Sequence, residues 1–161
     1  VWLFNSRCVE KAKHLQSQGK LSGTYHTLLS LADYAKKNQT PSTPNVLGIY
    51  LLGKVIQDML QKGIQAIRKE TEYKSAVLYQ ALEQSSVLKP FVKDATLRSR
   101  TVIVADAGNE RDRVMHALRQ IGFEPGEGYG VYKKSHLRFA NFPTHSREQI
   151  ERLADAIASL S

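Results

Sequence analysis

The chain has 161 residues and a mass of 18.1 kDa, which is enough for one domain with its own hydrophobic core and a short appendage. With 42% hydrophobic and 24% charged residues, it belongs neither to the disordered nor to the collagen-like class. Lys and Arg number 23 against 15 Asp and Glu, and the net charge of +8 favours anionic partners. Because the basic residues are dispersed along the sequence, we expect no nucleic-acid partner.

Several classes of protein are disfavoured by individual residues. The single cysteine, Cys8, permits no internal disulfide, which is typical of a reducing cytoplasm, and we expect the protein there. The longest apolar stretch, Val46 to Met59, includes Lys54 and Asp58 and is shorter than the roughly 20 residues of a membrane span, so we expect no membrane association. The apolar opening Val1-Trp2-Leu3-Phe4 is typical of a buried strand and predicts that the chain is the C-terminal part of a larger protein.

Two short helices and a connector are predicted at the start of the chain. Residues 6–19 alternate basic and apolar positions, with Ser6 as the expected cap and Gly19 as the stop. A second helical piece is expected at about residues 28–37. The segment Gln39-Thr40-Pro41-Ser42-Thr43-Pro44-Asn45 has two X-Pro steps, which favour an extended connector.

Two longer helices are predicted after the connector, at residues 46–62 and 64–83. Asn45 can cap the first of them with its side chain. Its inward face is expected to comprise Val46, Ile49, Tyr50, Gly53, Ile56 and Leu60. The second is expected to direct Ile67, Thr71, Leu78 and Leu82 inward and to expose Glu70 and Lys74 as an i, i+4 ion pair. We expect these two helices to form one helical layer.

The remaining residues predict strands and two more helices. The β-branched run Thr101–Ala105 is typical of an internal strand, and a second strand is expected at about residues 136–142. Asn109 is the expected cap of a helix, and Ser146 with Gln149 forms a capping box before another. The expected core positions of these helices are Val114, Met115, Leu118 and Ile121, and then Ile150, Leu153, Ala154, Ile157 and Leu160. The order ααβαββα predicts an α/β fold with helices packed on a small sheet.

Some motifs with possible chemistry are weak. The five histidines are scattered without the spacing of metal ligands, so no metal site is expected. Gly126, Gly128 and Gly130 lie between a predicted helix and a strand. A phosphate-binding glycine loop lies instead between a strand and a helix N-terminus, so we interpret these glycines as an ordinary loop.

Arg138 and Thr40 are the candidate binding residues. Arg138 is expected to point to the sheet face opposite Leu137 and Phe139, where a strand would hold its guanidinium rigidly for a carboxylate or phosphate. The alternative is a solvated or ion-paired arginine on an open sheet face. Thr40, beside Pro41, can direct its hydroxyl and backbone NH to a phosphate, or simply form a turn.

Several motifs together resemble a known family. The connector at residues 39–45 and the following Gly48-Ile49-Tyr50-Leu51-Leu52-Gly53 resemble the Asn-Thr-Pro-Pro-Thr-Phe connector and first small-domain helix of phosphoserine aminotransferases, in the class V branch of fold-type I pyridoxal-phosphate enzymes. Further similar motifs, in the same order, are Lys74-Ser75-Ala76-Val77-Leu78-Tyr79, Arg98-Ser99-Arg100 and Leu137-Arg138-Phe139-Ala140-Asn141. The resemblance covers essentially the whole chain.

The resemblance implies a homodimeric transaminase of serine biosynthesis. Such an enzyme uses pyridoxal 5'-phosphate to move an amino group between glutamate and 3-phosphohydroxypyruvate, so the partners are small amino-acid and 2-oxo-acid substrates. Residues 1–44 would be the end of the large cofactor domain with the connector, and residues 45–161 the C-terminal small domain.

The resemblance also assigns roles to individual residues. Thr40, with Gln39 where the family commonly has Asn, would contact the cofactor phosphate of the partner subunit's active site. Arg138 would bind the substrate α-carboxylate. The family's cofactor-linking lysine, ring aspartate and stacking aromatic lie upstream of Val1, so we expect no catalytic residue in this chain and no activity of the chain alone.

One departure leaves the substrate open. Many family members have a Gly-His-Arg motif that binds the substrate phosphate or side-chain carboxylate, whereas the corresponding loop, residues 128–134, contains no arginine. Lys133 or Lys134 would replace its charge without the bidentate geometry of arginine. Other class V aminotransferases, acting on alanine, serine or glyoxylate, remain alternatives, as does a non-catalytic α/β interaction module.

Overall fold

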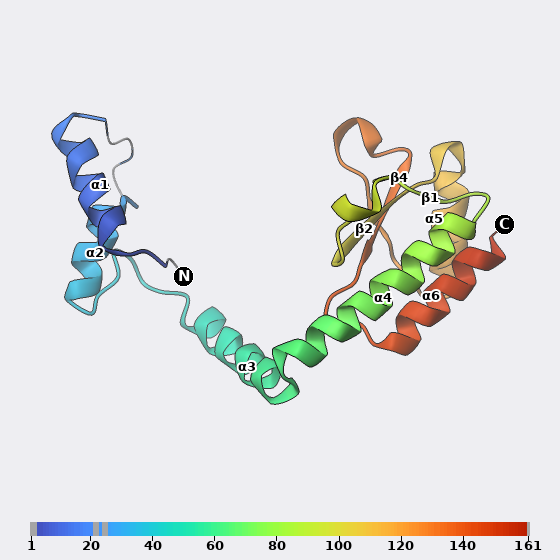
Figure 1. The fold of residues 1–161 in the computed structure, drawn as a ribbon, viewed down its shortest axis with the longest axis horizontal. Coiled ribbons are helices and arrows are strands. Elements are labelled where there is room, and N and C mark those ends of the chain that lie inside the picture. The colour runs from blue at the N-terminus through green and yellow to red at the C-terminus, as the bar shows by residue number, and fades with distance from the viewer. Residues whose placement is uncertain (1–2, 21–22, 24–25, 161) are drawn as a thin grey trace. The chain divides into compact units, whose positions relative to one another are not determined.

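The computed structural model describes residues 3–20, 23 and 26–160 (Figure 1). The chain divides into two compact units, Val1–Val55 and Ile56–Ser161. The opening residues Val1 and Trp2, part of the predicted terminal strand, lie outside the described residues. The expected assignment of residues 1–44 to a cofactor domain and 45–161 to a small domain stays a prediction.

The first unit contains two short helices that pack together, α1 (Ser6–Ser17) and α2 (Leu28–Lys36). The small side chains Ala12 and Ala32 are buried, one on each helix. Both predicted helices are therefore confirmed, but the predicted cap of α1 is wrong by one residue. Asn5 is the cap, because its side-chain oxygen accepts a hydrogen bond from the backbone NH of Cys8.

The helix α3 (Val46–Lys62) follows the connector as predicted. The side chain of Asn45 accepts a hydrogen bond of 2.9 Å from the backbone NH of Gly48 and so caps the helix. The predicted inward face of α3 is wrong, since no residue of this helix is buried in the described structure and Leu60 is 76% exposed. The expected pairing of α3 with the next helix is also wrong, because α4 packs on α6 instead.

After the end of α3, the second unit contains a four-stranded antiparallel sheet and the helices that pack on it. In chain order its elements are α4 (Ile64–Gln84), β1 (Lys89–Pro90), β2 (Val102–Asp106), α5 (Arg111–Gln120), β3 (Gly126–Glu127), β4 (His136–Ala140) and α6 (Arg147–Ser159). The strand order is β1-β2-β4-β3, with Val104 opposite Arg138 in the central pair. The predicted α/β class, with helices on a small sheet, is confirmed. The sequence analysis assigned no residue range to the two-residue strands β1 and β3.

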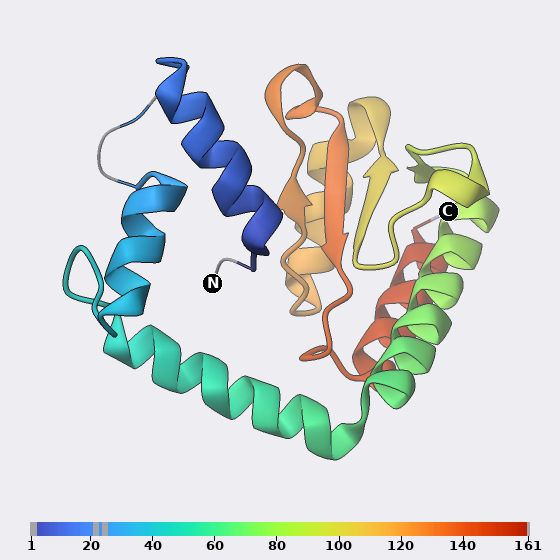
Figure 2. The same ribbon diagram turned by 60° about the vertical axis from the view of Figure 1, so that its left-hand side comes forward.

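The core of this unit lies between the helices and one face of the sheet. Alternate strand residues, such as Ile103 on β2 and Leu137 on β4, are fully buried against α4, α5 and α6. Figure 2 shows α4 and α6 side by side, in agreement with their contacts. The opposite face of β4 includes Arg138 and also His136, which is buried and contacts the rings of Phe91 and Tyr132.

The predicted core positions of α5 and α6 are largely confirmed. The capping box of Ser146 and Gln149 is present, and the four inner positions of α6 from Ile150 to Ile157 are buried. Two predictions for α5 are wrong. Asn109 lies in a 3-10 turn (Gly108–Glu110) and does not cap the helix, and Ile121 follows the last helical residue and is 48% exposed.

Lys74 corrects the predicted surface pair on α4. Its side chain is fully buried, and its amine donates hydrogen bonds to the backbone carbonyls of Phe142, at 3.0 Å, and His145, at 2.6 Å. Glu70 pairs instead with Lys62, at 2.6 Å. Burial lowers the pKa of Lys74, although the charge of Glu70 opposes that shift.

Candidate functional site

Arg138 lies on the face of β4 opposite the helical core, as the strand pattern predicts. Its neighbours Leu137 and Phe139 are 0% and 3% exposed, so they fix the strand in the core while the arginine points the other way. The arginine Nε donates a hydrogen bond of 2.6 Å to the backbone carbonyl of Glu127, and Nη1 donates one of 2.8 Å to the hydroxyl of Tyr129. The guanidinium carbon lies 4.0 Å from the centre of the Tyr129 ring, in a cation–π contact.

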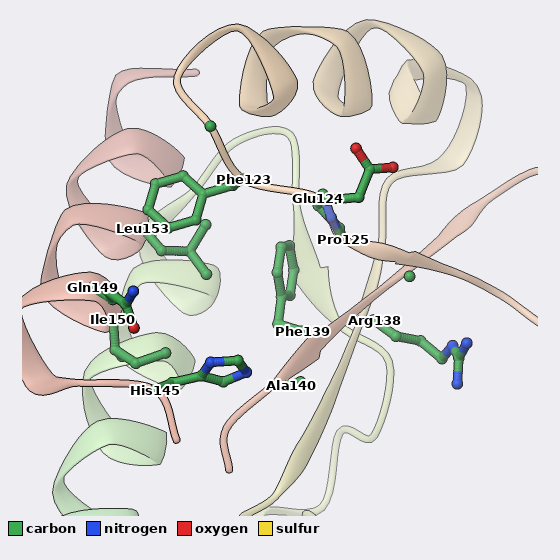
Figure 3. Close-up of a pocket in the computed structure, with 12 residues that line it drawn as sticks. Phe123, Glu124, Pro125, Arg138, Phe139, Ala140, His145, Gln149, Ile150 and Leu153 are labelled. Carbon is green, nitrogen blue, oxygen red and sulfur yellow. The ribbon is translucent and has the colours of Figure 1, made fainter. Parts of the chain in front are cut away.

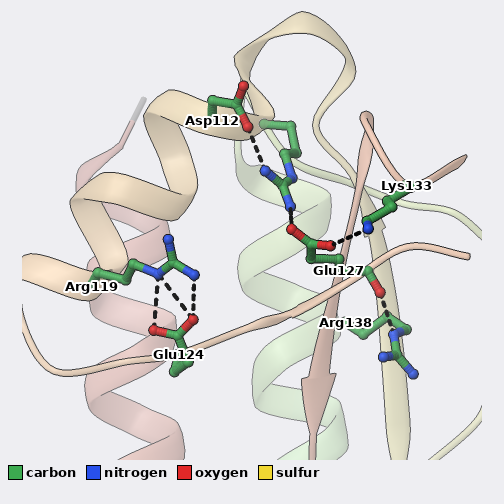
Figure 4. A network of polar contacts seen from close by, with 7 residues as sticks. Asp112, Arg119, Glu124, Glu127, Lys133 and Arg138 are labelled. Atoms are coloured by element: carbon green, nitrogen blue, oxygen red, sulfur yellow. Dashed lines mark hydrogen bonds and ion pairs between the residues drawn. The ribbon is translucent and has the colours of Figure 1, made fainter.

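The positive charge of Arg138 is not neutralised by a described carboxylate. The nearest acidic residue in the network, Glu127, gives Arg138 only its backbone carbonyl (Figure 4). Its carboxylate is bound by Arg111 at 2.5 Å and by Lys133 at 3.4 Å. The alternative of an ion-paired Arg138 is therefore wrong within residues 3–20, 23 and 26–160.

Glu127 is held in its charged form by this network. The hydrogen bond from Arg111 is the main cause that lowers the pKa of Glu127, and Lys133 adds to it. Arg111 also pairs with Asp112 at 2.5 Å, so one guanidinium links α5 to strand β3. Since Lys133 is engaged with Glu127, it offers less to a substrate anion than the sequence suggests.

Two glycines bring the β3 segment close to Arg138 and its loop. A Cβ on Gly126 would lie 3.2 Å from Nη2 of Arg138, closer than most real contacts. A Cβ on Gly128 would lie 2.3 Å from the backbone carbonyl oxygen of Tyr132, which no real side chain allows. The predicted glycine loop is therefore a close-packed support for Arg138, and this role was not read from the sequence.

A separate cavity of about 290 Å³ lies on the other side of β4 (Figure 3). Its lining includes Phe123, Phe139, Ile150 and Leu153. Arg138 belongs to the rim, but Figure 3 shows its guanidinium directed away from Phe139 and Leu153. The apolar part of this cavity and the guanidinium of Arg138 therefore lie on different sides of β4.

The two other predicted site residues lie in the first unit. Thr40 and Gln39 are exposed and line an open hollow of about 550 Å³, together with Asn38 and residues 42–44. The Thr40 hydroxyl donates a hydrogen bond of 2.7 Å to the carbonyl of Ser42. Because the Thr40 hydroxyl has a single proton and donates it to Ser42, it would have to exchange that bond to reach a phosphate oxygen. The side-chain amide of Gln39 is a neutral donor of the kind that binds phosphate oxygens, so the hollow fits a cofactor phosphate as a contributing site.

The described residues show no long apolar helix that could cross a membrane, and no cluster of three or more potential metal ligands.

Tyr129, Glu127 and Arg111 were missed as site residues by sequence reasoning. For Glu127 and Tyr129 the available signal was their place in the glycine-rich segment, whereas Arg111, on α5, had none. Loop sequence does not specify which side chains meet a strand residue.

Comparisons with known proteins agree with this architecture. The chain is 43% identical to a phosphoserine aminotransferase of Cytophaga hutchinsonii, whose crystal structure superposes with a TM-score of 0.87 over 97% of this chain and 43% of that one. It is 28% identical to the phosphoserine aminotransferase of Rhodococcus opacus, over 98% of this chain and 43% of the relative. An alanine–glyoxylate aminotransferase from Nostoc, at 17% identity and a TM-score of 0.70 over 98% of this chain and 42% of that one, shares the fold alone.

The chain thus spans less than half the length of these relatives. The family model described as aminotransferase class-V matches residues 2–146, which is most of the chain. The resemblance found in the sequence motifs is therefore confirmed. This chain belongs to the class-V aminotransferases, a family of pyridoxal-phosphate-dependent enzymes.

Proposed function

We propose that this chain is the C-terminal part of a phosphoserine aminotransferase. The reaction would transfer the amino group of glutamate to 3-phosphohydroxypyruvate and yield 2-oxoglutarate and phosphoserine. The 43% identity to the Cytophaga hutchinsonii protein of that name, over nearly all of this chain, supports this substrate pair. The proposal for the whole protein rests on relatives more than twice as long as this chain.

The observation that best supports this proposal is the state of the Arg138 guanidinium. It stands on a rigid strand, retains free donors and has no described carboxylate partner. A planar guanidinium in this state binds a carboxylate with two parallel hydrogen bonds. Both proposed substrates have a carboxylate beside the reacting carbon, so Arg138 would orient either of them in the same way.

Thr40 and Gln39 would contribute to the phosphate site of the cofactor in the partner subunit of a homodimer. Their exposure and their shared place in the hollow support this assignment, with Thr40 exchanging its hydrogen bond to Ser42 for one to the phosphate. When bound, pyridoxal phosphate supplies the electron sink that transamination needs.

The single exposed Cys8 supports a reducing compartment, and we assign the protein to the cytoplasm.

The 161-residue chain alone would be inactive. Arg138, Thr40 and Gln39 can bind and orient, but none of them can link covalently to the cofactor as a lysine does. We expect the purified chain to show no turnover with glutamate and 3-phosphohydroxypyruvate. Measurable transamination by the isolated chain would contradict this assignment.

The test is an assay of the full-length protein with both substrates, with Arg138→Ala beside the wild type. Loss of the two hydrogen bonds to a charged partner should lower kcat/KM for glutamate by roughly 100-fold, while the absorbance spectrum of the bound cofactor stays unchanged. Arg138→Lys should recover only part of the loss, because lysine cannot form the fork. Unchanged kinetics in Arg138→Ala would remove this residue from the site.

A second candidate is a class V enzyme that uses glyoxylate as acceptor. It is favoured by one observation, the absence of an arginine from the loop at residues 128–134. Lys133 is paired with Glu127 there, so a substrate phosphate has fewer cations available. The same assay with glyoxylate and alanine decides between the two: a higher kcat/KM for that pair would replace the phosphoserine assignment.

A further inference from the structure

We propose that Tyr129 is a second binding residue for the substrate carboxylate, and that its phenolic hydroxyl donates a hydrogen bond to the same carboxylate that Arg138 binds. This inference rests on the proposed aminotransferase function and adds a second substrate-binding residue to its site. Tyr129 belongs to the loop between β3 and β4.

The hydrogen-bond direction leaves the hydroxyl proton of Tyr129 available. Arg138 has only donors, so in the 2.8 Å contact Nη1 donates and the phenol oxygen accepts. A phenol oxygen that accepts still has its own O–H to donate. No described residue accepts that proton, and Tyr129 is 72% exposed, so a ligand can reach it.

The donors of the pair match a carboxylate. Of the five N–H groups of a guanidinium, Nε and one hydrogen of Nη1 are used by Glu127 and Tyr129. The second hydrogen of Nη1, both hydrogens of Nη2 and the phenol O–H have no described acceptor and are left for a ligand. A carboxylate offers about four lone-pair positions on two oxygens, so one oxygen can accept from the guanidinium and the other from the guanidinium and the phenol.

The loop holds Tyr129 in this position before a ligand arrives. On one side Glu127 is anchored by its carbonyl bond to Arg138 and by its ion pair with Arg111. On the other side the carbonyl of Tyr129 accepts a hydrogen bond of 3.0 Å from the backbone NH of Tyr132. The close approach of Gly128 to the Tyr132 carbonyl further limits the loop. A preplaced donor loses little conformational entropy on binding, so it adds to affinity.

The test is Tyr129→Phe in the full-length protein, because phenylalanine keeps the ring on the guanidinium and removes only the hydroxyl. We expect KM for L-glutamate and KM for 3-phosphohydroxypyruvate to rise about tenfold, with kcat little changed, since the lost contact is made in both ground and transition states. Tyr132→Phe is the matched control. Tyr132 is in the same loop and stacks on His136 at 4.4 Å, and it has no described contact with Arg138, so its kinetics should equal the wild type.

Calorimetric titration with glutarate, an unreactive dicarboxylate, gives a readout that does not depend on turnover. We expect Tyr129→Phe to weaken glutarate binding about tenfold and Tyr132→Phe to leave it unchanged. Equal binding by Tyr129→Phe and the wild type, or no glutarate binding by either, would overturn the proposal. A KM change confined to the phosphorylated substrate would also overturn it, because the hydroxyl would then contact the phosphate.

The outcomes also separate this inference from the proposed function. A wild type that binds glutarate through Tyr129 but does not transaminate contradicts the proposed function, while the carboxylate-binding role of Tyr129 still holds. An active wild type whose kinetics and glutarate binding do not change in Tyr129→Phe contradicts only the role of Tyr129. Equal thermal unfolding of the variants and the wild type shows that the comparison concerns binding rather than folding.

Discussion

Lys74 is a charged side chain in the interior of the unit formed by Ile56–Ser161. Its amine contacts the carbonyls of Phe142 and His145, which belong to the segment between β4 and α6. These hydrogen bonds offset the cost of taking an ammonium group out of water. One side chain of α4 therefore fixes the segment that follows the strand of Arg138.

We expect Lys74→Met to lower the free energy of unfolding by about 2–3 kcal/mol, because two carbonyls lose a charged donor in a buried position. Lys69→Met, an exposed position on the same helix, is the control and should change it by less than about 0.5 kcal/mol. Urea unfolding of both variants measures the difference. Equal stability of the two variants would show that Lys74 contributes no net stabilisation.

At this scale, sequence reasoning predicted the direction of the Arg138 side chain correctly and misjudged Lys74. The direction of Arg138 follows from strand alternation, which depends only on local sequence. The i, i+4 spacing of Glu70 and Lys74 is equally local, but it is compatible with any orientation of the helix. Which face of α4 is covered depends on α6 and on residues 142–145, so the burial of Lys74 could not be predicted from the spacing.

Strand β3 shows how ion pairs support a very short element. It consists of Gly126 and Glu127, and it pairs with Arg138 and Leu137 of β4. Two residues provide few backbone hydrogen bonds, so the pairing of the Glu127 carboxylate with Arg111 supplies an additional link to α5. Glycine is depleted in strands, which explains why this segment was interpreted as a loop from the sequence.

This arrangement predicts a pH dependence. The lowered pKa of Glu127 means that its ion pair stabilises the folded state fully above the ordinary glutamate pKa and loses this effect as the pH falls through the lowered pKa. We expect Glu127→Gln to be less stable than the wild type at neutral pH, with a difference that shrinks in acid. Thermal unfolding from neutral to acidic pH measures it.

Glu110→Gln is the control for that experiment. Glu110 lies just before α5 and pairs with Arg113 in a solvent-exposed i, i+3 contact. Exposed pairs of this kind contribute little. A stability difference for Glu127→Gln that is the same at every pH would mean that its ionisation is not the cause.

The cap of α6 could be predicted, whereas the start of α5 could not. The capping box of Ser146 and Gln149 is complete within four residues. At α5 the carboxylate of Asp106 accepts a hydrogen bond of 2.9 Å from the backbone NH of Gly108 and begins a 3-10 turn, so Asn109 lies inside the turn. The start of α5 thus depends on which of two neighbouring polar side chains, Asp106 or Asn109, binds the backbone NH groups.

Across the whole molecule, the order of helices and strands could be predicted, but the surroundings of α3 could not. The apolar period of α3 is real, yet its side chains are exposed in the structure. Periodicity identifies a face that needs a partner, and it does not identify the partner. The sequence prediction assumed that α4 covers this face, whereas α4 and α6 cover each other.

We expect the isolated chain to self-associate through α3, because contiguous exposed apolar surface of this kind promotes association. Leu47 and Leu51 are 68% and 53% exposed and lie one turn apart. Replacing both by Gln should lower the concentration-dependent increase in mass seen by sedimentation. Lys54→Gln is the control on the same helix and should leave the concentration dependence of the mass unchanged. A wild-type chain that stays monomeric at high concentration would contradict the prediction.

The alternation of β4 has a consequence for how this surface can change in evolution. Leu137 and Phe139 face the core and Arg138 faces outward, so inserting or deleting a single residue in the strand would exchange the two sets. The guanidinium of Arg138 would then be buried in the apolar core. The same change would therefore destabilise the fold and remove the contact with the ligand. Variation in ligand preference is therefore easier to accommodate in the adjoining loop that includes Tyr129 than in the strand itself.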